Sequence, residues 1–311
     1  MLSLDLGAKV YVVTGANGGL GRAISEYLAG RGATLYMVCR NKERGDKARD
    51  EIVQQTGNQK VHTLIADVAL AAEVRSAMAE LASREKRVDG IVCNAGAMTP
   101  EKTITPEGFE TTLAAGLLHG AYLLSSLALP LLRKSADPRV TFLSSGGMYN
   151  GKFPGFAVAN CESAKYNQEY AYVYVKRAQV ILAEELTKLA PDVKWLSVHP
   201  GWTETPGVTG WLGSGQKYLQ PMRNLWQGVE GISWMTVCPG DELKSGEFYL
   251  DRRPQVKHIA GAFFSEGTYT KNTKAEVEQL MSVLHEKVGK FDPSGPVVPH
   301  KEGDEAKPEA V

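Results

Sequence analysis

The stretch that decides the fold is Thr14-Gly15-Ala16-Asn17-Gly18-Gly19-Leu20-Gly21, which follows a short apolar run and leads directly into a helical pattern. Glycines at this point allow a tight turn and let the backbone approach a pyrophosphate closely. The following helix would present free backbone N–H groups and a favourable dipole to an anion. A glycine-rich turn between a first strand and a helix therefore predicts dinucleotide binding, although alone it could be an ordinary strand-to-helix connection.

Apolar runs typical of buried strands alternate with helical patterns along the rest of the chain. The predicted strands are Lys9–Val13, Thr34–Val38, Val61–Ile65, Gly90–Cys93, Val140–Leu143, Lys194–Val198 and Glu247–Leu250. The predicted helices are Gly21–Ala29, Lys42–Gln55, Ala72–Glu85, Pro106–Leu132, Tyr172–Leu189 and Lys274–Val288. This alternation predicts an α/β fold, a doubly wound Rossmann-like sandwich with a mostly parallel seven-stranded sheet.

One such domain is expected to cover residues 1–291. Two long segments interrupt its alternation, Gly146–Ala171 and Gly207–Arg223, both rich in Gly, Pro and aromatic residues without a strong period. Long irregular segments inside a compact domain are usually functional loops or lids. Residues 292–311 are rich in Pro, Glu and Lys, which is typical of a disordered tail.

The composition argues against several kinds of partner. The chain has 311 residues, 43% of them hydrophobic, and its 35 Lys+Arg and 35 Asp+Glu give a formal net charge of zero. That balance offers nucleic acid and anionic membranes no electrostatic attraction. The 4 cysteines form no C-x-x-C pair and the 6 histidines are scattered. We therefore expect reduced core thiols, no metal site, and an intracellular, cytoplasmic protein.

One apolar stretch requires a decision about membranes. Leu113–Leu132 is free of Asp, Glu, Lys and Arg and is long enough to cross a bilayer. It also contains glycines, a histidine, serines and a proline, and it lies within the series of strands and helices. We therefore predict a buried helix and no transmembrane segment. A signal peptide is not expected either, because the first strand begins almost at the first residue.

The end of the second predicted strand bears on the choice of cofactor. An acidic residue there would bind the ribose 2′-hydroxyl of NAD, but the sequence reads Val38-Cys39-Arg40, with Lys42 and Arg44 close behind. A guanidinium can bind a 2′-phosphate through two parallel hydrogen bonds. The sequence therefore favours NADP(H) over NAD(H), although these charges could simply be solvated at the start of a helix.

Tyr172-x-x-x-Lys176 stands at the head of a helical pattern, where the spacing puts both side chains on one face. A nearby ammonium stabilises a phenolate, so it is expected to lower the Tyr172 pKa from about 10 towards neutrality. The pattern alone is common by chance. Its value lies in its order, after the glycine turn, Asn94-Ala95-Gly96 and Ser144-Ser145, and before Pro200-Gly201.

In this order and content the chain resembles the short-chain dehydrogenase/reductase superfamily, over roughly residues 5–255. The shared motifs are T-G-x-x-x-G-x-G, N-A-G, a serine, Y-x-x-x-K and P-G. Val38–Asn41 and His199–Trp202 resemble the retinol-dehydrogenase-like branch. The stretches most similar to the dehydrogenase/reductase member 12 group are Ser144–Met148, His199–Val208 (HPGWTETPGV) and Phe248–Pro254 (FYLDRRP).

The resemblance implies a catalytic triad. Tyr172 would exchange the proton with the substrate oxygen, and Lys176 would lower the Tyr172 pKa and hold the nicotinamide ribose. Ser145 would hydrogen-bond the substrate oxygen as charge develops there. Among the cofactor contacts, Asp67 would meet the adenine, Asn94 the ribose side and Thr205 the carboxamide. The full implied cofactor set is Gly15, Asn17, Gly19, Leu20, Gly21, Arg40, Asp67, Asn94, Tyr172, Lys176, Pro200 and Thr205.

Two features depart from the family pattern. Many members carry an Asn in the helix after the fourth strand, which completes a proton relay, but Gly116 or Leu117 stands here. Ser145 and Tyr172 are 27 residues apart, about twice the usual spacing. The additional length is Gly146–Ala171, which we expect to lie over the nicotinamide end as a substrate lid.

The leading hypothesis is an NADP(H)-dependent oxidoreductase that interconverts a carbonyl and an alcohol. Its substrate is expected to be a small apolar molecule, because aromatic residues occur in the later irregular region, and the long helices suggest a homodimer. Those aromatic residues, Trp202, Trp211, Tyr218 and Trp226, could equally belong to the core or an interface. The alternatives are a catalytically weak NADP-binding regulator, which loss of the Asn would suit, and a pure scaffold.

Overall fold

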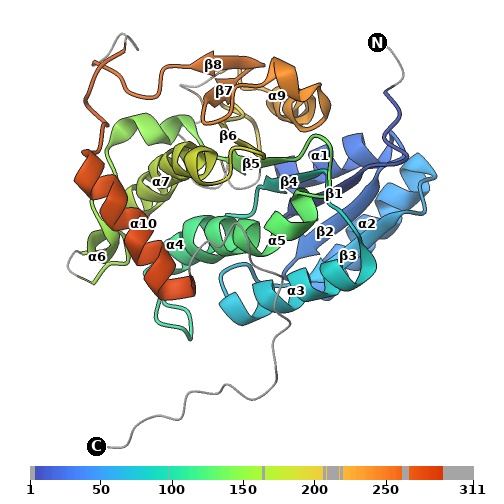
Figure 1. The fold of residues 1–311 in the computed structure, drawn as a ribbon, viewed down its shortest axis with the longest axis horizontal. Coiled ribbons are helices and arrows are strands. Elements are labelled where there is room, and N and C mark those ends of the chain that lie inside the picture. Colours follow the sequence, from blue (N-terminus) through green and yellow to red (C-terminus); the bar gives the residue numbers. More distant parts are fainter. Residues whose placement is uncertain are drawn as a thin grey trace, which may run out of the picture.

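The computed structural model describes residues 4–96, 98–162, 165–205, 208, 217, 220–260 and 266–289. Its strands form one sheet in the order β3-β2-β1-β4-β5-β6-β7-β8 (Figure 1). The strands are β1 (Val10–Thr14), β2 (Thr34–Cys39), β3 (Val61–Ile65), β4 (Gly90–Cys93), β5 (Arg139–Leu143), β6 (Lys194–Val198), β7 (Phe248–Leu250) and β8 (Arg253–Gln255). Neighbouring strands pair in parallel from β3 to β7, which confirms the predicted doubly wound α/β sheet.

The sheet has 8 strands, so the prediction of seven was wrong by one. The additional strand, β8, returns antiparallel beside β7 after a two-residue turn, with Leu250 opposite Arg253. Its sequence, Arg253-Pro254-Gln255, is short and polar and carries no apolar alternation that could have revealed a strand. Proline is tolerated here because β8 lies at the edge of the sheet.

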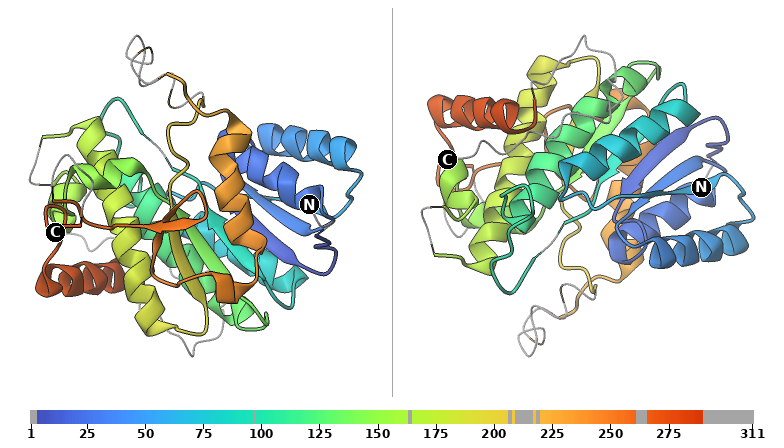
Figure 2. Two further views of the ribbon diagram at one scale, coloured as in Figure 1. Left: turned by 90° about the horizontal axis from the view of Figure 1, so that it is seen from above. Right: turned by 90° about the horizontal axis from the view of Figure 1, so that it is seen from below.

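Helices cover both faces of the sheet. One face carries α1 (Gly19–Ala29), α2 (Lys42–Thr56) and α9 (Leu225–Val237) (Figure 2). The other carries α3 (Ala71–Arg84), α7 (Gln168–Leu189) and the long helix formed by α4 (Thr111–Leu113), η1 (Ala114–Leu123) and α5 (Leu124–Leu132). Residues of β1 alternate between the two cores. Val10 and Val12 pack in one, and Tyr11 and Val13 pack in the other. Burial on both faces is why β1 is a nearly continuous apolar run.

The outer elements complete these layers. α10 (Lys274–Val288) packs on the outside of η1, where the His285 and Tyr122 rings lie 5.8 Å apart. The segment predicted as irregular, Gly146–Ala171, contains η2 (Gly146–Asn150), α6 (Phe156–Ala159) and the first turn of α7. α9 was not predicted, although Asn224 and Gln227 form a capping box at its start.

The long central helix consists of α4 (Thr111–Leu113), the π-helical η1 (Ala114–Leu123) and α5 (Leu124–Leu132). It begins at Thr111 rather than at the predicted Pro106, because the buried Glu110 carboxylate accepts from the first backbone N–H groups, those of Thr112 and Leu113. Of its most apolar 18 residues, 83% are buried inside the protein. The stretch that could have crossed a membrane by length is therefore packed as a core helix.

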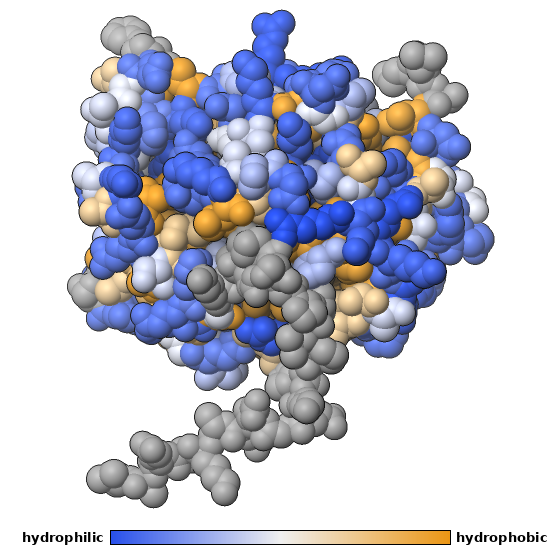
Figure 3. Space-filling view, in the orientation of Figure 1, coloured by the Kyte–Doolittle hydropathy of each residue, from blue (hydrophilic) through white to orange (hydrophobic). Residues whose placement is uncertain are grey.

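The surface agrees with this distribution of apolar residues. Figure 3 shows a largely hydrophilic face with apolar side chains in small, separate patches. All 4 cysteines of the chain are buried free thiols, as the sequence predicted. The predicted tail at 292–311 and the domain limit at 291 lie outside the described residues.

Gly116 in η1 generates a stability prediction. A Cβ atom there would lie 2.5 Å from Cγ1 of Val175, whose branched side chain is held in the helix α7. We expect Gly116→Ala to lower the free energy of unfolding by about 1–3 kcal/mol, outweighing the gain in helix propensity. Urea denaturation measures this. Gly151→Ala is the matched control, since its Cβ would meet nothing closer than 3.8 Å; equal effects at both positions would contradict the packing argument.

Candidate active site

The glycine turn joins β1 to α1 at the carboxyl edge of the sheet. Gly15 adopts a φ of +64°, which glycine tolerates and other residues rarely adopt. A Cβ on Gly21 would lie 2.4 Å from the Gly15 carbonyl oxygen, so only glycine lets α1 approach the turn this closely. α1 begins after Gly18 with no side-chain cap and no acidic residue in its first turn. Its N-terminal N–H groups therefore suit an anionic group such as a pyrophosphate.

Asn94 ties this turn to the end of β4. Its amide nitrogen donates to the carbonyl oxygens of Thr14 at 2.7 Å and Gly15 at 3.3 Å. The Ala95 N–H donates in return to the Thr14 hydroxyl at 2.9 Å. β1 and β4 are the neighbouring strands at which the order of the sheet reverses, and ligands of open α/β sheets bind in the crevice at such a point.

Arg40 and Asp67 lie beyond the ends of β2 and β3. The Arg40 guanidinium is 67% exposed and lies 3.6 Å from an Asp67 carboxylate oxygen. Asp67 also accepts from the Ala69 backbone N–H at 2.9 Å. Asn41 caps α2 by accepting from the Arg44 N–H, and Lys42 pairs with Asp46. The exposed Arg40 guanidinium thus lies just beyond the carboxyl end of β2.

The two serines after β5 have different surroundings. The buried Ser144 hydroxyl donates to the Lys176 carbonyl oxygen at 2.7 Å. The Ser145 hydroxyl hydrogen-bonds the phenol of Tyr172 and also accepts from the Gly147 N–H at 3.1 Å. The second serine of the pair is therefore the one beside Tyr172, although the two residues are 27 positions apart.

The titration of this cluster differs from the expectation. Burial raises the pKa of Tyr172, and the hydrogen bond with Ser145 lowers it only in part. The Lys176 nitrogen lies 5.3 Å from the Tyr172 ring centroid and donates to the Leu143 carbonyl oxygen at 2.6 Å. Burial lowers the pKa of Lys176 itself to about 8. The predicted lowering of the Tyr172 pKa by Lys176 was wrong for this structure, in which loss of water around the phenol raises that pKa and the hydrogen bond with Ser145 is what opposes the rise.

At the position expected for the family Asn, Gly116 makes a hydrogen bond through its backbone carbonyl. The Gly116 carbonyl oxygen accepts from the side-chain amide of Gln179 at 2.7 Å. Gln179 is buried on α7, three residues after Lys176. Gln179 was not predicted as a site residue, although its spacing from Tyr172 and Lys176 puts all three on one face of α7.

The segment between Ser145 and Tyr172 is anchored on two sides. Towards the chain after β4, the Thr99 and Tyr166 hydroxyls lie 2.8 Å apart and Lys102 donates to the Cys161 carbonyl oxygen at 2.8 Å. Towards α10, the Asn272 amide donates to the Phe153 carbonyl oxygen at 2.7 Å. At its start, Gly147 lies against Tyr172, and a Cβ there would be 3.6 Å from the phenol ring.

The turn after β6 forms the remaining side of the site. The His199 ring stacks on Phe248 at 5.1 Å, and its Nδ1 accepts from the Gly201 N–H at 3.3 Å. Burial lowers the pKa of His199 to about 4, so it is neutral at physiological pH. The Thr205 hydroxyl accepts from the Val208 N–H at 3.3 Å.

Of the four aromatic residues considered for the substrate site, the structure describes Trp202 and Trp226. Trp202 is 50% exposed, and Trp226 stacks on Tyr27 of α1 at 5.7 Å, on the face that α1 and α9 share. Trp211 and Tyr218 lie outside the described residues.

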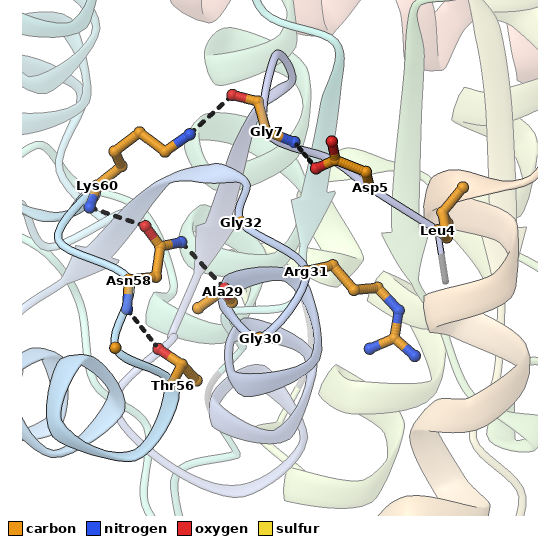
Figure 4. Close-up of a pocket in the computed structure, with 11 residues that line it drawn as sticks. Leu4, Asp5, Gly7, Ala29, Gly30, Arg31, Gly32, Thr56, Asn58 and Lys60 are labelled. Atoms are coloured by element: carbon orange, nitrogen blue, oxygen red, sulfur yellow. Dashed lines mark hydrogen bonds between the residues drawn. The ribbon is translucent and has the colours of Figure 1, made fainter. Parts of the chain in front are cut away.

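A hollow of about 510 Å³ lies at the opposite edge of the sheet. Its walls precede β1, β2 and β3, whereas the glycine turn, Arg40, Asp67, Asn94, Ser145 and Pro200 follow the carboxyl ends of strands. Figure 4 shows that its polar groups bond to one another, with Lys60 donating to the Gly7 carbonyl and Asn58 to the Ala29 carbonyl. This hollow is therefore separate from the candidate active site.

Comparison with known proteins agrees with the geometry. Residues 9–211 match the family model of the short chain dehydrogenases. The chain is 32% identical to dehydrogenase/reductase SDR family member 12 of Bos taurus over 292 residues, covering 93% of this chain and 89% of the relative. It is 33% identical to retinol dehydrogenase 11 of Mus musculus over 267 residues, covering 85% of this chain and 79% of the relative.

Solved structures share the fold. The crystal structure of a short chain dehydrogenase of Escherichia coli CFT073 in complex with NADPH aligns with a TM-score of 0.65 at 20% identity, over 82% of this chain and all of the other. A 3-ketoacyl-(acyl-carrier-protein) reductase of Brucella melitensis in complex with NADH aligns with a TM-score of 0.63 at 21% identity, over 78% and 96% of the two chains.

These matches confirm the resemblance drawn from the motifs, including its retinol-dehydrogenase-like character. The chain belongs to the short-chain dehydrogenase/reductase family and is an NAD(P)-dependent oxidoreductase.

Proposed function

We propose that the protein is an NADP(H)-dependent oxidoreductase that interconverts an apolar carbonyl compound and its alcohol. The observation that carries this proposal is the cluster of Ser145, Tyr172 and Lys176 beside the glycine turn. The phenol hydrogen-bonds the serine, and the lysine lies on the same face of α7. Bound NADPH would supply the hydride, and this cluster would manage the proton on the substrate oxygen.

The cofactor site follows from the same edge of the sheet. The turn from Gly15 to Gly21 and the start of α1 would hold the pyrophosphate, and Arg40 would bind the 2′-phosphate. The Asn94 side chain holds the turn through its bonds to the Thr14 and Gly15 carbonyls, and Lys176 would contact the ribose. Asp67 would border the adenine, where its carboxylate also steadies Arg40. The turn from Pro200 to Thr205 would meet the carboxamide.

In the reduction, Tyr172 is the proton donor. Its raised pKa keeps the phenol protonated at neutral pH, so the proton is in place when charge develops on the carbonyl oxygen. Ser145 donates a second hydrogen bond to that oxygen. The Lys176 ammonium favours the phenolate that remains after the proton has left.

We assign Gly146–Ala171 as the cover of the substrate end. Met148 and Phe153 are buried within it, and its bonds to Thr99 and Asn272 hold it to the chain after β4 and to the start of α10. A cover fixed in this way excludes water around the reacting groups. Its apolar interior favours an apolar substrate.

A catalytically weak NADP-binding regulator is the alternative, favoured by the Gly116 position. The backbone carbonyl there is already bonded to Gln179 and no asparagine side chain is present. An assay of NADPH consumption with a panel of carbonyl compounds separates the two functions, since the regulator would bind NADPH without turnover.

The Tyr172→Phe variant tests the proton donor. It keeps the ring but removes the hydroxyl, so kcat for carbonyl reduction should fall by about 10²–10⁴ while the Kd for NADPH hardly changes. Tyr170→Phe and Tyr174→Phe are matched controls, because these rings stack on each other at 5.8 Å, with Tyr170 exposed, and should matter little. Full NADPH-dependent activity in Tyr172→Phe would show that the donor is another group.

Arg40→Asp tests the cofactor preference. A charge-assisted hydrogen bond contributes about 1.5–3 kcal/mol, so the wild type should bind NADPH roughly tenfold or more tightly than NADH. The variant should reverse that order by repelling the 2′-phosphate and accepting from a 2′-hydroxyl. Lys42→Ala is the control, since Lys42 pairs with Asp46. Equal Kd values for both cofactors in the wild type would refute the assignment.

The pH dependence of kcat/KM for NADPH tests Lys176. A lysine with its pKa lowered to about 8 is charged below that pH and loses its charge as the pH rises through it. Reduction should therefore decline above about pH 8, where the phenol, with its raised pKa, is still protonated. In Lys176→Arg, which stays charged, the remaining activity should lack this decline. A flat wild-type profile from pH 7 to 9.5 would contradict the role of Lys176.

A further inference from the structure

The turn between β7 and β8 holds two residues in an uncommon conformation. Asp251 and Arg252 have φ values of +48° and +65°, and they are the whole two-residue connection of the hairpin. Positive φ at both central positions is typical of a type I′ turn, where Asn-Gly and Asp-Gly are preferred because larger residues are strained. Strain of this kind persists where the surrounding structure requires the side chains, and it concentrates near functional sites.

The two side chains of this turn contact different parts of the protein. The Asp251 carboxylate accepts from both terminal nitrogens of Arg223, at 2.5 and 2.6 Å. Arg252 pairs instead with Glu230 on α9 and stands over the Trp234 ring at 5.7 Å. The turn backbone lies close to α9, because a Cβ on Gly231 would meet the Arg252 nitrogen at 3.3 Å. These contacts with α9 hold the hairpin turn, and with it Asp251, in place.

Arg223 connects Asp251 of the hairpin turn to the turn after β6. A Cβ on Gly201, whose φ is +70°, would lie 2.6 Å from the Arg223 Nε, so the guanidinium stem lies directly against this glycine. The backbone of Arg223 also pairs with the same turn, donating to the Trp202 carbonyl at 2.8 Å and accepting from the Glu204 N–H at 2.9 Å. Through Arg223, Asp251 therefore holds the backbone from Gly201 to Glu204.

We infer that the Arg223–Asp251 pair is a positioning element that sets the turn Pro200–Thr205 against the nicotinamide end of the cofactor. The inference rests on the proposed function, in which this turn meets the carboxamide. Two residues on opposite sides of the turn support it. Thr203 is buried against Gly228 of α9, and His199 is sandwiched between Phe248 and the chain at Gly146. The turn is held on these sides by packing, and the ion pair fixes the side at Gly201.

Asp251→Asn tests the pair with little risk to the fold. Asparagine tolerates a left-handed φ and is favoured in type I′ turns. The variant therefore removes the charge and keeps the turn. Arg252→Asn is the matched control, because it also removes a charge from this turn but breaks the contacts with Glu230 and Trp234 on α9 and leaves the pair with Arg223 intact. The readouts are Kd values for NADPH and for 2′,5′-ADP, the adenine half of the cofactor, together with kcat, KM and Tm.

The expected result is a KM and Kd for NADPH raised roughly three- to fivefold in Asp251→Asn, as suits a half-exposed charge pair, with 2′,5′-ADP binding unchanged. Arg252→Asn should leave all binding and kinetic constants unchanged. Unaltered constants in Asp251→Asn, a shift in Tm alone, or equal losses for NADPH and 2′,5′-ADP would overturn the inference. A wild type that neither binds NADPH nor reduces a carbonyl overturns the proposed function as well, so the two failures are distinguishable.

Discussion

The contact on which the site depends is the amide of Asn94 against the end of β1. The register between β1 and β4 ends at Val13 opposite Val92, so Thr14 and Gly15 lie beyond the residue pairs that these two strands form. Unpaired carbonyl groups inside a protein are costly, and the Asn94 side chain satisfies both. The same bonds fix the glycine turn, so the site for a pyrophosphate and the crevice beside it arise from one requirement of backbone hydrogen bonding.

The residues that could be predicted from the sequence are those whose place follows from the end of a strand. Arg40, Asp67, Asn94, Ser145 and the turn at Pro200 each stand within two residues of the end of a mostly apolar parallel strand, so their shared edge follows from the parallel topology. β8 could not be predicted, because three polar residues at an edge carry no pattern. Gln179 and Arg223 were missed for another reason. Their partners, Gly116 and Asp251, lie 63 and 28 residues away, and no local spacing encodes such pairs.

The electrostatics of the cluster could not be predicted from spacing either. The i, i+4 relation places Tyr172 and Lys176 on one face, but it does not determine how much water each retains. Burial disfavours the charged form of both groups, raising the pKa of the phenol and lowering that of the ammonium to about 8. In this state the pair is close to a neutral phenol and a weakly held ammonium. An incoming negative charge on the substrate oxygen or the cofactor would stabilise the ammonium, so ligand binding and protonation of Lys176 are thermodynamically coupled.

These observations divide the site into two halves with different physical origins. The cofactor half is built by the strand ends and the start of α1, whose geometry follows from the sheet itself. The proposed nicotinamide and substrate end would be built from segments held in place by side chains: η2 and its continuation, anchored to Thr99 and Asn272, and the turn after β6, held by Arg223. A change in a strand end would disturb the whole sheet, whereas a change in an anchored segment alters only its few side-chain contacts. Solved structures about 20% identical to this chain accordingly share its fold.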